Sequence, residues 1–374
     1  MNTPSYLGLT WDHPRGYAAL DAAAAQVAPG HGMSLHWERH PLEGFESHPI
    51  AELAARHDLI VLDHPHIGEA LATDCLRPME DVLGMAEVST LARETIGPSM
   101  ASYAFDGAHW ALPLDAASQV MAFAPGVVEE PPRTWDDVLA LADKRRVALS
   151  LSGPHAALTF QSVAAAFQGR TRPKGRFVTP EAGREAYAVM QALTTQATRD
   201  YAGHNPIALL HALAAGADLA LVPLVYGYVN YAASGQVVFS DAPRGPAGIG
   251  SILGGTGIAV SRRAPITPAL RRHLRWLMSS EAQCSFIPAH AGQPALHAAW
   301  CDAACDAAAG HFYSATRATL EGAALRPRHA GAIAFQTEIA QRLREGLLTG
   351  EAAEPVLAAL EAAFARYYEE GTET

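Results

Sequence analysis

The sequence has no run of about 18 uninterrupted apolar residues, the length that a membrane-spanning helix needs. It is also poor in charge, since 17% of its 374 residues are charged, and its formal net charge is -11. A chain of this acidity is not expected to bind a nucleic-acid backbone, because such binding relies on clustered Lys and Arg. We therefore expect neither a membrane span nor a nucleic-acid partner.

Several chemical motifs are missing as well. There is no G-x-S-x-G elbow, P-loop or H-E-x-x-H pair, so the sequence predicts no catalytic residue. The four cysteines lack the spacing of a zinc site, and we predict no metal and no cofactor. Cys301 and Cys305 lie four residues apart on an expected helix, where they would share a buried or half-buried face.

The chain is rich in apolar residues, at 49%, and in Ala-rich helical segments. Its length exceeds one ordinary hydrophobic core, so two lobes are expected. Strands and helices are expected to alternate at the start of the chain, which predicts a doubly wound parallel sheet of the α/β class. The expected strands are Tyr6–Thr10, Met33–Trp37 and Leu59–Leu62, and the expected helices are Tyr17–Val27 and Ile50–Arg56.

Further elements follow along the chain. Strands are expected at 118–123, 148–151 and 217–222. A helix should begin after Thr134, with Asp137 completing an acidic capping box. The residues from 338 to 368 are expected to be helical, with a break near Gly350 and Pro355.

The segment from Trp11 to Tyr17 is the strongest local candidate for a binding site. It follows the first expected strand, at the sheet edge where ligands of α/β proteins bind. An aromatic ring, a carboxylate, an imidazole and a guanidinium occur within seven residues, and they suit stacking and charged hydrogen bonds. Arg15 favours a ligand with a carboxylate or another anion. The alternative is that Trp11 packs in the core and Asp12 caps the next helix.

Five short segments together resemble a known family. They are Asp58-Leu59-Ile60-Val61-Leu62-Asp63-His64-Pro65, Trp110-Ala111-Leu112-Pro113-Leu114-Asp115, Gly254-Gly255-Thr256-Gly257-Ile258-Ala259-Val260-Ser261, Ser279-Ser280-Glu281-Ala282-Gln283 and Arg326-Pro327-Arg328-His329. In this order they resemble the extracellular solute-binding proteins of bacterial ABC importers, in the carbohydrate-binding branch. The resemblance implies a two-lobed, type II periplasmic-binding-protein-like fold in which each lobe is a mainly parallel sheet flanked by helices.

The same resemblance implies how the lobes are built and what they do. Lobe 1 would comprise 1–113 and 252–310, and lobe 2 would comprise 114–251 and 311–374, with hinges near 112–116 and 250–255. A monomer would close its interlobe cleft on a small polar ligand, such as a sugar, a sugar acid or a similar anion. An ABC permease would be its partner, and the periplasm its compartment.

The ligand-binding residues expected from this combined reasoning come from seven places in the chain. They are Trp11, Asp12, His13, Arg15, Tyr17, Asp63, His64, Asp115, Gln119, His155, Tyr226, Tyr228, Gly255 and Gln293. Each has a structural alternative, such as packing for the tyrosines, hinge architecture for Asp115 and Gln119, or a plain turn for Gln293. The two histidines at 64 and 66 do not by themselves supply the three or four ligands that zinc needs.

A second interpretation stays open. The first ten residues, MNTPSYLGLT, contain neither the basic nor the apolar region of a signal peptide. The loops holding Asp12, His13, Asp63 and His64 could also supply a general acid and base. The alternative is therefore a cytoplasmic enzyme or ligand sensor built on the same scaffold.

Overall fold

The computed structural model describes residues 3–41 and 48–368. Seven strands form one sheet in the order β2-β1-β3-β11-β6-β7, with β8 also paired to β6. These strands are β1 (Ser5–Trp11), β2 (Ser34–His40), β3 (Leu59–Leu62), β6 (Leu112–Phe123), β7 (Leu221–Tyr226), β8 (Val238–Ser240) and β11 (Leu253–Val260). Two small hairpins pair β4 (Ala104–Phe105) with β5 (Ala108–His109) and β9 (Arg244–Gly245) with β10 (Gly248–Ile249).

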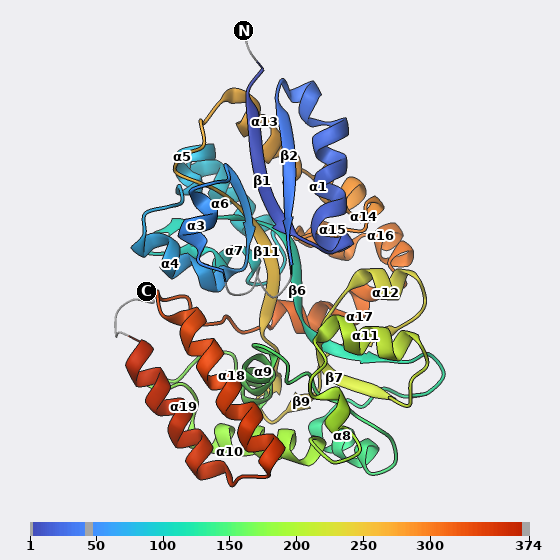
Figure 1. The fold of residues 1–374 in the computed structure, drawn as a ribbon. Coiled ribbons are helices and arrows are strands. Elements are labelled where there is room, and N and C mark those ends of the chain that lie inside the picture. Colours follow the sequence, from blue (N-terminus) through green and yellow to red (C-terminus); the bar gives the residue numbers. More distant parts are fainter. Residues whose placement is uncertain (1–2, 42–47, 369–374) are drawn as a thin grey trace.

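Helices cover the sheet on both sides, in an upper and a lower group (Figure 1). Those packed in the upper half of Figure 1 are α1 (Pro14–Gln26), α3 (Ile50–Ala54), α4 (Ile67–Ala72), α5 (Met79–Leu83), α6 (Met85–Glu94), α7 (Ser99–Ser102), α13 (Pro268–Leu277), α14 (Ile287–Ala289), α15 (His297–Cys301) and α16 (Ala303–Ala308). Those below are α8 (Trp135–Ala142), α9 (His155–Gln168), α10 (Pro180–Leu193), α11 (Pro206–Ala214), α12 (Val229–Ala233), α17 (Phe312–Glu321), α18 (Ala332–Thr349) and α19 (Ala353–Tyr367).

Single turns complete the element order. They are η1 (Ala28–His31), η2 (His64–His66), η3 (Arg199–Tyr201) and η4 (Ala282–Phe286), the last of them a π-helical turn.

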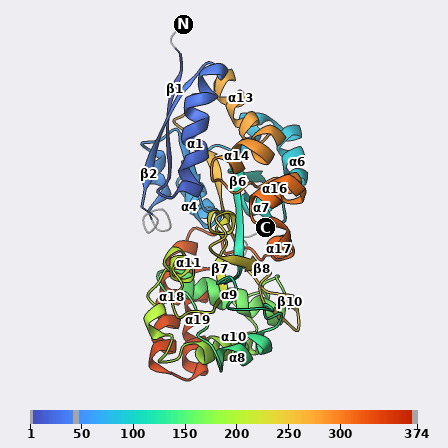
Figure 2. The ribbon, with the colours of Figure 1, turned by 90° about the vertical axis from the view of Figure 1, so that its right-hand side faces the viewer.

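One long strand joins the two halves. The first part of β6, from Leu112 to Ser118, pairs with β11, and the part from Gln119 to Phe123 pairs with β7 and β8. Figures 1 and 2 show β6 running from the upper into the lower half in both views. The chain crosses back just before β11, and the segment 322–331 between α17 and α18 contacts the upper half, where Arg326 meets Asp63 and Arg328 meets Ala101. These crossings produce the two lobes that the resemblance implied, and β6 spans the expected first hinge.

The sheet is parallel only in part. β2, β1 and β3 are parallel to one another, as the strand–helix alternation predicted. β11 and β6 are antiparallel to their neighbours. This mixed pairing was not expected from the sequence.

Most of the expected elements are confirmed. β1, β2, β3, α1 and α3 lie within a few residues of their predicted bounds. α8 begins after Thr134, with the predicted capping box completed by Asp137. α18 and α19 are separated at Gly350, which has a φ of +72°, while Pro355 lies inside the first turn of α19, where its missing N–H costs nothing.

Three expectations are wrong. The segment 148–151 is not a strand, because Val147 forms only an isolated bridge to Leu221. The strand expected at 217–222 lies at Leu221–Tyr226 instead. Cys301 and Cys305 do not share one helix, since Asp302 ends α15 and caps α16; Cys301 is exposed and Cys305 is buried.

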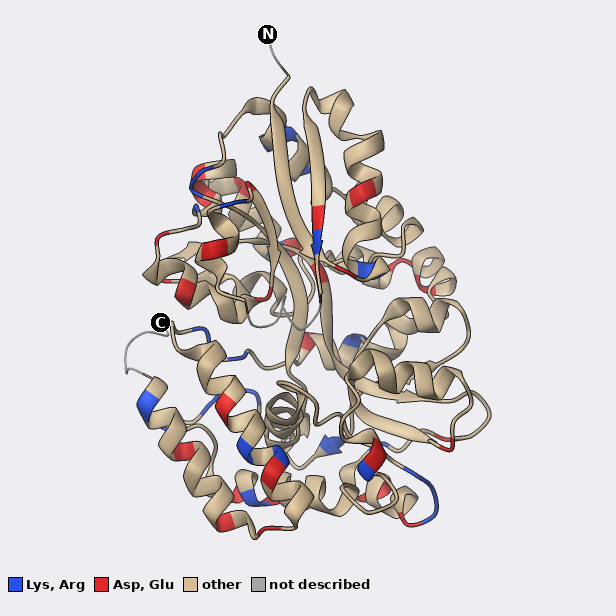
Figure 3. Cartoon of the chain, viewed as in Figure 1, with Lys and Arg blue, Asp and Glu red and all other residues tan. Residues whose placement is uncertain are grey.

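The core is continuous across the junction of the two halves. One cluster of buried apolar residues runs from β1 and α1 through β6 into α11 and β7, while a second lies wholly in the lower half, around α9, α10, α18 and α19. Acidic and basic side chains are interspersed over both halves (Figure 3). Within the described residues, no helix is both long and apolar enough to cross a membrane.

Candidate functional site

A buried ion pair stands where the two halves meet. Arg15, in the first turn of α1, donates from Nε to Oδ2 of Asp115 at 2.7 Å and from Nη2 to Oδ1 at 2.5 Å. Its Nη1 donates to the carbonyl oxygen of Gly227, just after β7, at 2.8 Å. The guanidinium of a helix in the upper half therefore holds both the crossing strand and a loop of the lower half.

Burial affects both partners of this pair. Burial lowers the pKa of Arg15, but the charge and hydrogen bonds of Asp115 raise it by more, so its pKa ends above the ordinary value. Burial raises the pKa of the Asp115 carboxyl, and the Arg15 guanidinium opposes that rise. Both carboxylate oxygens already accept from Arg15. The pair is thus neutral as a unit, and Arg15 has no unpaired charge in this structure.

Aromatic rings surround this guanidinium. It lies 4.7 Å from the ring centroid of Tyr228 and 5.7 Å from that of Trp11, within cation–π range. His13 stacks on Trp11 at 5.2 Å and meets Tyr228 edge-on at 4.9 Å. Trp11 and Tyr228 are both buried, while His13 is half-buried. The predicted residues Trp11, His13, Arg15 and Tyr228 are therefore brought together.

The start of α1 explains this local geometry. His13, not Asp12, caps the helix, because its Nδ1 accepts the backbone N–H of Arg15 at 3.1 Å. Pro14 follows at the first helical position, where its fixed φ is already suitable. Burial, followed by the charges of Arg15 and His211, lowers the pKa of His13 to about 4. The cap is consequently a neutral imidazole near pH 7.

A second ion pair lies on the other side of the junction. Asp63, which follows β3, contacts Nη2 of Arg326 at 3.0 Å, and the Arg326 side chain is 4% exposed. His64 is fully buried, and its Nε2 accepts the backbone N–H of Arg326 at 3.3 Å. Burial, with the charges of Arg326 and Arg328, lowers the pKa of His64 well below its usual value.

His155 and Tyr226 bring the lower half to the same place. His155 is the first residue of α9, and its ring meets the Tyr226 ring edge-on at 6.2 Å. Burial, and then the Arg326 charge, lowers the pKa of His155 to about 3. Tyr226 ends β7 and packs against Gly254 of β11, where a Cβ would meet the ring at 2.4 Å. Both predicted residues are thus next to the crossing strands.

Gln119, Gln293 and Gly255 hold the crossing strands in place. Gln119 accepts from Ser162 of α9 at 2.6 Å through its side-chain oxygen. Gln293 accepts the backbone N–H of Val229 at 3.1 Å and donates to the carbonyl of Ala116 at 2.6 Å. Gly255 lies in β11 beside Asp115, at a φ of +84°. In this structure all three residues therefore make structural contacts around β6 and β11.

Asp12 and Tyr17 lie apart from the buried cluster. Asp12 is exposed and contacts Arg39 at 3.8 Å, and the Arg39 guanidinium lies 3.4 Å from the Tyr17 ring centroid. Both therefore form part of a surface group around β2.

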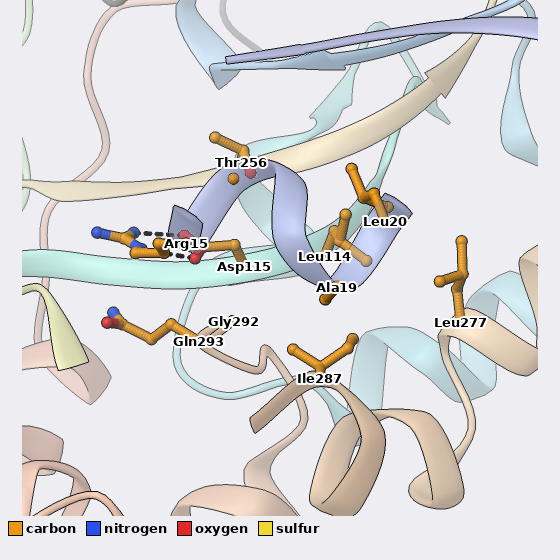
Figure 4. A pocket seen from close by; sticks show the side chains of 11 residues that line it. Arg15, Ala19, Leu20, Leu114, Asp115, Thr256, Leu277, Ile287, Gly292 and Gln293 are labelled. Atoms are coloured by element: carbon orange, nitrogen blue, oxygen red, sulfur yellow. Dashed lines mark hydrogen bonds and ion pairs between the residues drawn. The ribbon is translucent and has the colours of Figure 1, made fainter. Parts of the chain in front are cut away.

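A narrow pocket opens behind the Arg15–Asp115 pair. Figure 4 shows the pair at one end of it, Gln293 nearby, and Leu277 and Ile287 on the far wall. Its volume of about 20 Å³ is close to the roughly 10–15 Å³ that one water molecule needs. A sugar cannot occupy this pocket in this conformation.

Sequence reasoning missed part of this site. Arg326 pairs with the Asp63 carboxylate at the junction, and Arg328 donates to carbonyls of Ala101 and Ala104 at 2.8 Å each. Tyr103 was not singled out, yet it is buried and donates to the carbonyl of Leu62 at 3.1 Å. No spacing signal marks either role, since both depend on contacts between distant segments.

Comparison with known proteins identifies the fold. No protein-family model matches the chain, and no curated protein matches it. Among solved structures, the chain is similar to the GacH receptor of Streptomyces glaucescens, which was solved unliganded and in complex with acarbose. The sequence identity is 16% and the TM-score is 0.81, and the match covers 99% of this chain and 100% of the receptor chain. Maltose-bound MalE3 of T. maritima is 15% identical, with a TM-score of 0.79 and coverages of 97% and 100%.

A third structure agrees with these two. An ABC transporter solute-binding protein from Agrobacterium radiobacter, in complex with ribitol, is 16% identical with a TM-score of 0.80, covering 98% of this chain and 99% of its own. At such low identity the likeness concerns the fold. The chain therefore has the two-lobed α/β fold of ABC transporter solute-binding proteins, as the sequence predicted.

Proposed function

We propose that this protein binds a small, uncharged, polyhydroxylated molecule, a sugar or a polyol, at the junction of its two lobes. The observation that supports the proposal is that the charged side chains at the junction neutralise one another. Arg15 pairs with Asp115, Arg326 pairs with Asp63, and the imidazoles of His13, His64 and His155 have lowered pKa values. A site without surplus charge suits a neutral ligand.

Aromatic rings at the same place support the choice of ligand. Trp11, Tyr226 and Tyr228 present apolar faces beside hydrogen-bonding groups, and this combination matches the apolar faces and hydroxyl groups of a sugar. Proteins of the same fold have been solved with acarbose, maltose and ribitol. The ligand would enter between the lobes, and closure would bring the rings and the ion pairs around it.

Under this proposal the moving units are 1–113 with 252–310 and 114–251 with 311–374. The first boundary falls inside β6 and the second just before β11, where the chain crosses between the halves. Closure would present the loaded protein to an ABC permease from outside the cytoplasm. Fractionation of cells producing the full-length gene product tests the compartment, because the proposal requires the protein outside the cytoplasmic fraction.

A thermal-shift screen tests the binding function. A ligand that binds only the folded state raises the melting temperature according to its concentration relative to Kd. The panel should contain maltose, acarbose, ribitol and tagatose, with gluconate and glucuronate as anionic counterparts. We expect a neutral compound to raise the melting temperature and the acids to have no effect. Shifts by the acids alone would contradict the neutral ligand, and chemical conversion of a panel compound would favour an enzyme.

A further inference from the structure

A larger cavity lies away from the junction, in the lower half. It has a volume of about 210 Å³ and sits between the start of α10 and the first turns of α19. This volume is more than ten times the roughly 10–15 Å³ that one water molecule needs. The cavity shares no lining residue with the pocket behind Arg15 and Asp115.

The floor of this cavity is apolar. Val178 and Leu357 line it, and Gly183 lies between them. A Cβ at Gly183 would lie 3.1 Å from Cγ2 of Val178 and 3.3 Å from Cδ2 of Leu357. The absence of a side chain at Gly183 therefore lets Val178 and Leu357 pack closely against α10. Such a floor suits an aliphatic or aromatic group of modest size.

The rim carries opposite charges on its two sides. Arg176 and Arg184 come from the α10 side, and Glu354 comes from the α19 side. All three side chains belong to exposed residues. Arg184 is 3.3 Å from the exposed Glu181, and Arg176 forms no ion pair with any described carboxylate. Exposed pairs of this kind contribute little to stability, so these groups remain available to a ligand.

A fourth charged group on the rim is already engaged. Both oxygens of Glu361 accept backbone N–H groups, from Phe177 at 3.2 Å and from Val178 at 3.1 Å. Glu361 therefore fixes the loop that leads into α10 and is not counted as a ligand contact. Guanidinium groups on one side, one uncommitted carboxylate on the other and an apolar floor between them define the chemistry of the cavity.

We propose that this cavity is a second binding site, and that its ligand is a zwitterion with an apolar side chain, namely an apolar α-amino acid. The α-carboxylate would face Arg176 and Arg184, the ammonium group would face Glu354, and the side chain would lie on Val178 and Leu357. The proposal does not depend on the function of the interlobe junction. A singly charged analogue would lose one half of this complementarity.

Titration with L-leucine, monitored by ligand-observed NMR, tests the proposal. The analogues 4-methylpentanoate and 3-methylbutylamine keep the side chain and lack the ammonium and the carboxylate group, respectively. We expect L-leucine to bind at least fivefold more tightly than either analogue. Equal affinity for all three compounds, or no binding of L-leucine, would overturn the proposal.

Three surface variants place the site. Arg176→Gln and Arg184→Gln should each weaken L-leucine and 4-methylpentanoate at least threefold and leave 3-methylbutylamine unchanged. Glu354→Gln should weaken L-leucine and 3-methylbutylamine and leave 4-methylpentanoate unchanged. Arg145→Gln, an exposed change outside the cavity, is the matched control. L-leucine affinity that is the same in all four variants would place binding elsewhere and overturn the proposal, whatever the sugar screen shows.

Discussion

Gly255 lies so close to Asp115 that a Cβ at Gly255 would stand 2.3 Å from the Asp115 carbonyl oxygen. The two residues belong to the crossing strands β11 and β6, beside an irregularity in their register. Gly255 also has a φ of +84°, a backbone conformation that glycine adopts without steric cost. The close approach of β11 to β6 is therefore built on a position that only glycine fills.

Gly255→Ala should lower the free energy of unfolding by at least about 2 kcal/mol, because it combines a left-handed backbone with a backbone clash. The matched control is Gly235→Ala, since Gly235 has a φ of +70° and a Cβ added there would meet nothing within 4 Å. Urea denaturation measures both variants. Equal losses in the two would show that the close approach to Asp115 has no energetic consequence.

Arg15→Ala should lower the free energy of unfolding by about 3–5 kcal/mol, because it leaves the Asp115 carboxylate buried without its partner. Replacing both residues, as in Arg15→Met with Asp115→Leu, should restore much of that loss. Arg39→Ala removes an exposed ion pair with Asp21 and serves as the control, with little expected change. A loss in Arg15→Ala no larger than that in Arg39→Ala would refute the role of the buried pair.

Stability should fall in mildly acidic solution. The ordinary pKa of a histidine is 6.5. Burial is the main cause that lowers the pKa of His13 to about 4 and that of His155 to about 3. Below pH 6.5 the two imidazoles take up protons in the unfolded chain but stay neutral in the folded chain. Their contribution to the free energy of unfolding is therefore fully present above pH 6.5 and is lost as the pH falls towards 4. Each group contributes a slope of up to about 1.4 kcal/mol per pH unit in that window.

Urea denaturation of the His155→Gln variant between pH 7.5 and 4.5 measures this slope. The variant should have a shallower dependence than the unaltered protein, and His36→Gln, at an exposed position of β2, should keep the original one. An identical dependence in His155→Gln would mean that His155 does not stay neutral in the folded state.

The cysteines should differ in reactivity at neutral pH. Cys301 is exposed, whereas burial, followed by the charge of Asp302, raises the pKa of Cys305 to about 11. Because the thiolate is the nucleophile, iodoacetamide should label Cys301 first and Cys305 only after unfolding. Mass spectrometry of the Cys301→Ser variant provides the control. Early labelling of Cys305 in the folded protein would contradict its burial.

Local patterns in the sequence predict local structure well. The apolar run at Leu59–Leu62 became a strand of the same bounds, and Thr134 with Asp137 formed the expected capping box. Both signals involve neighbouring residues. The prediction of a strand at 148–151 was wrong. These residues have the apolar pattern of a strand, but they form no ladder with a neighbouring strand, and only the preceding residue Val147 forms an isolated bridge.

The candidate site depended on contacts that no local pattern contains. Arg15 and Asp115 were both expected in the site, but their pairing across 100 positions removes the free cation that Arg15 suggested. Arg326 pairs with Asp63 from more than 250 residues away, and its charge also lowers the pKa of His155. A sequence shows which residues are charged, but only the fold shows which opposite charges lie close enough to neutralise each other.

The most direct test of ligand binding at the lobe junction is a calorimetric titration of the unaltered protein, Tyr226→Ala and Tyr201→Ala with the sugar or polyol found in the screen. Tyr226 is half-buried beside His155 and Gly254, and Tyr201, equally half-buried, lies in η3 of the same half. We predict at least a tenfold weaker Kd for Tyr226→Ala and a change below twofold for Tyr201→Ala. An unchanged Kd in a folded Tyr226→Ala would contradict binding at the junction.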